Sequence, residues 1–201
     1  MTSPVGRSHH PWLALVAMLA VQMLASMIMS TAAVLSPAVA PLLSLPPERV
    51  GLFVAVAYLA AMTAGLPTGR WVARWGGVRV SQASLLSLAL GALLASVGDV
   101  RTLVPAALCI GFGYGLSNPS AAAVLARHVP AQSSGLFFSM KQAGVPLGVA
   151  VAGLAMPLGL GMVGWQVSVR TGALVCALAS SVCTSITPRP TAFAISRTDG
   201  G

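Results

Sequence analysis

Six long apolar runs dominate this sequence and restrict the folds that it can adopt. A helix needs roughly 20 mostly apolar residues to cross the hydrocarbon core of a bilayer. Charged residues are only 7% of the chain, against about 25% in soluble domains, which is too few to cover a water-facing surface. We therefore predict transmembrane spans at residues 12–35, 50–68, 80–97, 103–126, 135–158 and 165–186.

The spans are predicted to be helices that pack as antiparallel neighbours. Backbone polar groups in lipid must be satisfied internally, which leaves helices or a closed barrel, and continuous apolar runs without alternation exclude the barrel. The connections at 98–101 and 159–164 are too short to cross a bilayer. The expected fold is an all-α integral membrane bundle over residues 12–186, with a cytoplasmic segment at 1–11 and a disordered cytoplasmic tail at 187–201.

The arginines lie mainly between the spans, and their distribution predicts the orientation of the chain. Short loops rich in Arg and Lys face the cytoplasm. One side holds Arg7, Arg70, Arg74, Arg79, Arg127, Arg189 and Arg197, and the other holds Arg49, Arg101 and Arg170. Both termini are therefore expected to be cytoplasmic, in a bacterial inner membrane. The net charge of +8 is then charge at the membrane surface, and nucleic acid is not an expected partner.

The basic segment between the second and third spans carries a family pattern. It begins at Gly69 and reads Gly-Arg-Trp-Val-Ala-Arg-Trp-Gly-Gly-Val-Arg. It resembles the loop signature of the major facilitator superfamily, Gly followed by Asp-Arg-x-Gly and further basic residues, with matches at Gly69, Arg74, Gly76 and Arg79. The resemblance implies a cytoplasmic gating loop. Ala73 replaces the usual Asp, which argues against latching by charge, and the alternative is a positive-inside loop without a gating role.

The fourth and fifth spans carry the stronger resemblance. They contain Gly-Phe-Gly-Tyr-Gly-Leu-Ser-Asn-Pro from position 111 and Phe-Ser-Met-Lys-Gln-Ala-Gly-Val-Pro-Leu-Gly from position 138. The second segment is similar to the fifth-helix region of bacterial members of the same superfamily. Small residues allow helices to approach closely and proline bends them, so packing and kink positions are expected at Gly144, Pro146, Gly148 and Gly153. A frequent fourth-helix Arg of the family is absent, its place falling near Ala107.

The resemblance implies one half of a transporter. Members of the superfamily normally have two six-helix halves, each a 3+3 inverted repeat, and bind solute between the halves near mid-membrane. This chain resembles the N-terminal half. We expect it to be a truncated product, and the alternative is a half that pairs with itself or with a second half-transporter. A membrane scaffold or assembly protein that transports nothing is the rival function.

Four polar side chains within the predicted spans are candidates to line a solute cavity. They are Lys141, Gln142, Asn118 and Gln22. A charge inside a membrane is costly, and its default interpretation is a functional site. For Lys141 the alternative is that the side chain extends to the headgroups, and for the three amides it is hydrogen bonding between helices.

The positions of the acidic residues restrict the class of solute that we expect. Glu48, Asp99 and Asp199 all lie outside the spans. Recognition of a cation, or coupling to protons or sodium ions through an acid, is therefore not expected in these six spans. The side chains that are present favour a small anionic or neutral polar solute.

We predict neither an enzyme nor a cofactor. The sequence contains no nucleophile–base arrangement and no phosphate-binding Gly-Lys-Ser/Thr loop. Cys109, Cys176 and Cys183 lie within apolar runs, and no cluster of histidine, cysteine and acidic residues is present to hold a metal.

Overall fold

The computed structural model describes residues 11–44, 46–129 and 131–185, and every regular element among them is a helix. Predictions for residues 1–10 and 186–201 lie outside the described residues. Six helical segments are long and apolar enough to cross a membrane, one of them built from two consecutive helices. The elements are α1 (Pro11–Leu42), α2 (Pro47–Trp75), α3 (Gly77–Ala95), α4 (Val100–His128), the short 3-10 helix η1 (Ala131–Ser133), α5 (Ser134–Gln142), α6 (Gly144–Val163) and α7 (Trp165–Ser185).

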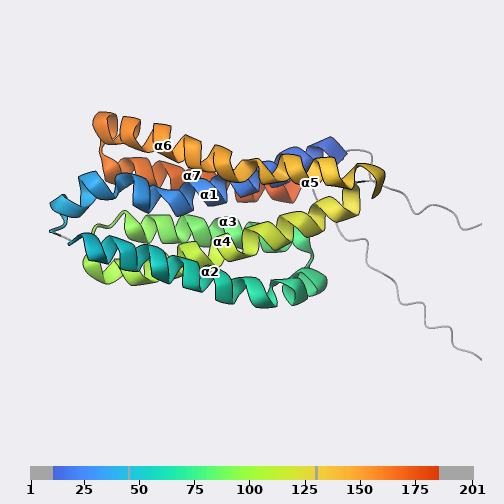
Figure 1. The fold of residues 1–201 in the computed structure, drawn as a ribbon, viewed down its shortest axis with the longest axis horizontal. Coiled ribbons are helices and arrows are strands. Elements are labelled where there is room, and N and C mark those ends of the chain that lie inside the picture. The colour runs from blue at the N-terminus through green and yellow to red at the C-terminus, as the bar shows by residue number, and fades with distance from the viewer. Residues whose placement is uncertain (1–10, 45, 130, 186–201) are drawn as a thin grey trace, which may run out of the picture.

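The helices lie side by side and alternate in direction along the bundle (Figure 1). The start of α1, the end of α7 and the α2–α3 and α4–α5 junctions lie at one end of the bundle, and the α1–α2, α3–α4 and α6–α7 junctions lie at the opposite end. Helix α4 packs mainly on α2 and α3, α1 packs mainly on α6 and α4, and α7 packs mainly on α3. The expected all-α membrane fold of six spans is confirmed.

Helix α4 makes its closest approaches at glycines. A Cβ added at Gly111 or Gly115 would overlap the carbonyl oxygen of Ala57 or Ala61 on α2, and one added at Gly113 would lie 2.7 Å from the backbone oxygen of Ser84 on α3. Ser84 also donates a hydrogen bond of 2.6 Å to the Gly113 carbonyl. Small residues thus bring three helix backbones into contact, which is how helices associate in lipid.

The helices extend beyond the predicted spans because hydropathy reports only the residues within the hydrocarbon core. Helix α1 continues through Pro37, where a chain break was expected, to Leu42. Proline removes the hydrogen bond to the carbonyl of Ala33, and Ser36 Oγ donates to that carbonyl at 2.9 Å. Similarly, α6 continues to Val163, so the expected glycine-rich turn is reduced to Gly164.

The predicted basic loop is also largely helical. Gly69 and Arg74 lie within α2, and Arg79 lies in the first turn of α3. The connection consists of Gly76 alone, whose φ of 85° favours glycine. The expectation of a loop here was wrong because these polar residues lie at helix ends, where their side chains reach the interface without ending the helix.

The fifth span is broken where a single kinked helix was expected. Helix α5 ends at Gln142, α6 begins at Gly144, and the amide of Ala143 donates to Ser139 and Met140 carbonyls, both at 3.2 Å. Pro146 has no N–H to donate to the carbonyl of Gln142, four residues earlier. The break therefore lies at Ala143, two residues after Lys141.

Candidate solute site

Lys141 is the buried cation around which the candidate site is built. Its side chain is only 2% exposed, and Nζ donates a hydrogen bond to Oδ1 of Asn118 on α4. Asn118 lies ten residues before the end of α4, which is about 15 Å along a helix, or half of a hydrocarbon core of about 30 Å. The side chain of Lys141 is thus directed toward α4 and the interior of the membrane.

Close contact between α1 and α6 fixes the helix that carries Lys141. A Cβ added at Gly144 would lie 2.9 Å from the backbone oxygen of Leu19, and one added at Gly148 would overlap the backbone oxygen of Met23. Both glycines are buried. The part of the fifth span that follows Lys141 is therefore packed closely on α1.

Gln22 brings a further polar group from α1 to the same junction. Its side chain is 2% exposed, and its Oε1 has no hydrogen-bond partner among the described residues. The Cβ of Gln22 lies 3.1 Å from the position that a Cβ of Gly144 would take. A buried amide oxygen without a donor is costly, so this position suits a water molecule or a solute that can donate.

Two tyrosines extend the polar cluster toward α2, and sequence reasoning did not single them out. Tyr114 lies one turn before Asn118 on α4, and its ring meets Tyr58 of α2 edge to face, with centroids 6.4 Å apart. Ser26 lies one turn beyond Gln22 on α1, and its buried Oγ has no hydrogen-bond partner among the described residues. A tyrosine within an apolar span, one turn from an asparagine, was the signal that could have identified Tyr114.

Of the hydrogen-bonded pair, Lys141 is buried and Asn118 is exposed, and the remaining candidates lie apart from both. Gln142 is exposed, on the side of α5 that faces away from the described bundle. Gly153 is also exposed, and a Cβ added there would meet nothing within 4 Å. In the candidate gating segment, Gly69, Arg74 and Arg79 are exposed, and Gly76 is half-buried.

The acids of the described chain lie at helix ends. Glu48 is in the first turn of α2, and Asp99 precedes α4, where it accepts a hydrogen bond of 2.8 Å from the amide of Arg101. The helix interiors between residues 11 and 185 therefore contain no carboxylate, and no group of metal-ligating side chains occurs in this part of the chain. Lys141 has no counter-ion among these residues.

The model of the Major Facilitator Superfamily matches residues 18–199. The chain belongs to this superfamily. The resemblance stated from the two sequence patterns is confirmed, and the chain is a multi-pass membrane protein of a transporter family rather than an enzyme family. Its six spans correspond in number to one half of a superfamily transporter. Comparison with curated proteins gives no match.

Proposed function

We propose that this superfamily member takes part in transport of a small anionic solute, and that Lys141 binds the solute's charge. The observation that carries the proposal is a buried ammonium group without a counter-ion among the described residues, hydrogen-bonded to a neutral amide. Uncompensated charge within a membrane is costly and is retained for function. An anion would supply the missing charge.

The hydrogen bond to Asn118 suits a site that fills and empties. An ammonium group has three donors, and Asn118 occupies one of them. The amide therefore holds Lys141 in place when the site is empty, and the other donors are available to a carboxylate or phosphate. A neutral holding partner releases the cation more easily than a carboxylate would, because an amide carries no net negative charge to attract the ammonium group.

A second six-helix unit, either another half or a second copy, is the proposed partner across the site. Asn118 and Gln142 are exposed residues within the spans. An amide that faces hydrocarbon with unsatisfied donors or acceptors costs several kcal/mol, on the order of 4–8 in an alkane reference, and the bond from Lys141 satisfies only the oxygen of Asn118. A water-filled cavity between this bundle and a second unit would remove that cost, as in the two-halved architecture of the superfamily.

The end of the bundle that carries the α2–α3 and α4–α5 junctions is proposed to face the cytoplasm of a bacterial cell. Arg70, Arg74, Arg79 and Arg127 lie at this end, and Arg49, Arg101 and Arg170 lie toward the other, so the described residues give a small excess of positive charge at this end. This imbalance follows the positive-inside rule.

Charge selectivity is the direct test of the proposed solute class. We expect butyrate or inorganic phosphate to raise the midpoint of thermal unfolding of the purified full chain in nanodiscs, while butyramide raises it less and butylammonium not at all. At a hundredfold excess over Kd, binding stabilises by about 2.7 kcal/mol, which is several degrees. Equal stabilisation by butylammonium and butyrate would mean that Lys141 does not select the solute.

Cysteine labelling tests both the orientation and the cavity. In a background with Cys109, Cys176 and Cys183 replaced by serine, Arg101→Cys should react with a membrane-impermeant maleimide from outside intact cells, and Gln132→Cys only after permeabilisation.

In the same background, Gln142→Cys should react with a small water-soluble thiosulfonate. Leu154 is also exposed, but its surroundings are apolar, so Leu154→Cys should not react with this reagent. Protection of Gln142→Cys to the same degree as Leu154→Cys would place lipid, not water, beside the site.

A further inference from the structure

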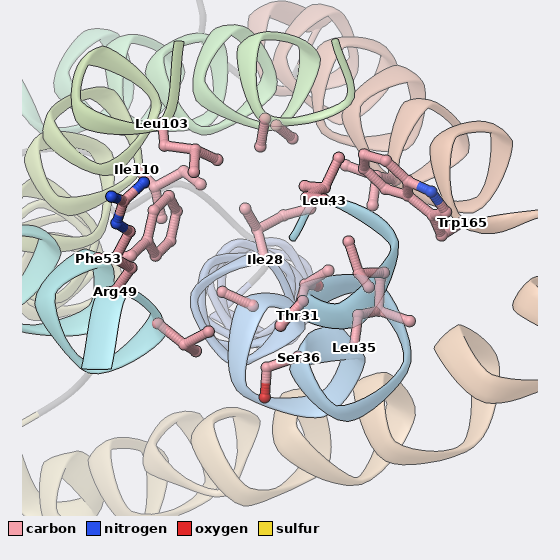
Figure 2. A pocket seen from close by; sticks show the side chains of 17 residues that line it. Ile28, Thr31, Leu35, Ser36, Leu43, Arg49, Phe53, Leu103, Ile110 and Trp165 are labelled. Carbon is pink, nitrogen blue, oxygen red and sulfur yellow. The ribbon is translucent and has the colours of Figure 1, made fainter. Parts of the chain in front are cut away.

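A cavity lies inside the bundle, away from Lys141, Asn118 and Gln22. It has a volume of about 110 Å³ and is lined by residues of α1, α2, α3, α4 and α7 but none of α5 or α6 (Figure 2). On α1 its lining runs from Ile28 to Ala40, with Leu43 just beyond the helix, whereas Gln22 and Ser26 lie before that range. The cavity is therefore in the half of the bundle remote from Lys141, and it does not belong to the candidate solute site.

The interior of this cavity is apolar. Its walls include Leu35, Phe53 and Trp165. Two hydroxyls also line it, but Thr31 donates to the carbonyl of Met27 at 2.8 Å, and Ser36 already donates to its own helix. Since these hydroxyl protons are used, the interior offers little to a polar molecule, and apolar cavities of this kind stay dry and accept hydrocarbon.

Arg49 supplies one charge at the edge of the cavity. Its guanidinium lies beside the ring of Phe53, and Trp165 lies across the cavity from it (Figure 2). Arg49 is exposed, and it forms no ion pair with a carboxylate of the described residues, although Glu48 is its neighbour in the chain. A guanidinium with a free edge binds carboxylate or phosphate through two parallel hydrogen bonds.

We propose that this cavity binds the alkyl chain of a single-chain fatty carboxylate, with the acid held by Arg49 and the chain directed toward Trp165. The site has a charged end and an apolar end, as a fatty carboxylate does. The volume fits a short length of chain, because an engineered apolar cavity of about 150 Å³ holds a benzene molecule. The position at the end of the bundle with Arg49 lets the carboxylate remain at the membrane surface while its chain enters the protein.

Trp165 provides the probe for this site. The sequence contains four tryptophans, and replacing Trp12, Trp71 and Trp75 with phenylalanine leaves Trp165 as the only one. In nanodiscs of zwitterionic phospholipid, 5-bromopentanoate, whose chain is short enough for the cavity, should quench its fluorescence saturably, since bromine at the chain end would lie near the ring. We expect 5-bromopentanol, which has the same chain and no charge, to bind at least about fivefold more weakly, as loss of a charged hydrogen bond predicts.

Matched variants separate the charge from the cavity. Arg49→Gln should weaken quenching by the bromo acid at least about fivefold and leave quenching by the alcohol unchanged, whereas Arg101→Gln, at the same end of the bundle and outside the cavity lining, should change neither. Ala32→Phe, which places a ring in the cavity, should abolish saturable quenching by both. Thermal unfolding of each variant checks that it is folded. Saturable quenching that survives Ala32→Phe, or an Arg49→Gln effect equal for acid and alcohol, would overturn the proposal.

Discussion

Lys141→Met is expected to reduce initial solute uptake into proteoliposomes by on the order of 100-fold. Methionine keeps the length and apolar stem of lysine, so the variant removes mainly the charge. Truncating one partner of a buried, hydrogen-bonded charge pair costs about 2–5 kcal/mol, and each 1.4 kcal/mol is tenfold in affinity. The measurement is uptake of whichever anion most stabilises the unmodified chain, made in an assembly that transports.

Three controls define what the loss would mean. Lys141→Arg keeps the charge and should retain measurable uptake, although guanidinium and ammonium are not equivalent in shape. Asn118→Ala should reduce uptake less than Lys141→Met, because it removes a holding contact and leaves the cation. Arg101→Gln removes a positive charge at a helix end and should have little effect. Unchanged uptake by Lys141→Met, with the other variants folded, would show that the lysine is a packing residue and that the solute binds elsewhere.

The span pattern was readable from the sequence, and the helix ends were not. Hydropathy identifies the residues in hydrocarbon, and the six predicted runs each fall on a described helical segment. The ends failed where a helix leaves the membrane. Pro37 and Arg74 appear as breaks in an apolar run, yet Ser36 satisfies the carbonyl freed by the proline, and an arginine at the interface does not disturb a helix. For the fifth span, the sequence predicted only a kink, because the presence of Pro146 does not determine how large the distortion of the helix is.

The sequence predicted the charged residue of the candidate site but not the residues that contact it. A lysine among apolar residues can be recognised directly in the sequence. Its pairing with Asn118, 23 positions away, depends on how α4 and α5 cross. The unpaired oxygen of Gln22 likewise requires the contact between α1 and α6. The apolar cavity beside Arg49 could not be predicted from the sequence, because its lining residues come from five different helices.

Gly148→Val is expected to destabilise the folded protein strongly. A Cβ at this position would overlap the backbone oxygen of Met23 and lie 2.8 Å from the Cβ of Ser26. Neither atom is the flexible end of a side chain, so α1 and α6 must separate. Overpacking typically costs about 1–3 kcal/mol where side chains can adjust; with backbone in contact we expect at least about 3 kcal/mol, a large share of a total stability of about 5–15 kcal/mol. Thermal unfolding and size-exclusion chromatography of a fluorescent fusion measure the effect.

Gly153 provides the matched control on the same helix. Gly153→Ala adds a methyl group in open space and should be neutral or stabilising by up to about 1 kcal/mol, since alanine favours helix over glycine. Gly148→Ala should destabilise, and it should also weaken anion binding, because separating α6 from α1 moves Lys141 away from Asn118. Equal stability of the two alanine variants would mean that α1 and α6 do not approach at Gly148. A destabilised Gly148→Ala variant with unchanged anion affinity would mean that α5 is held independently of α6, and that the break after Lys141 uncouples the two.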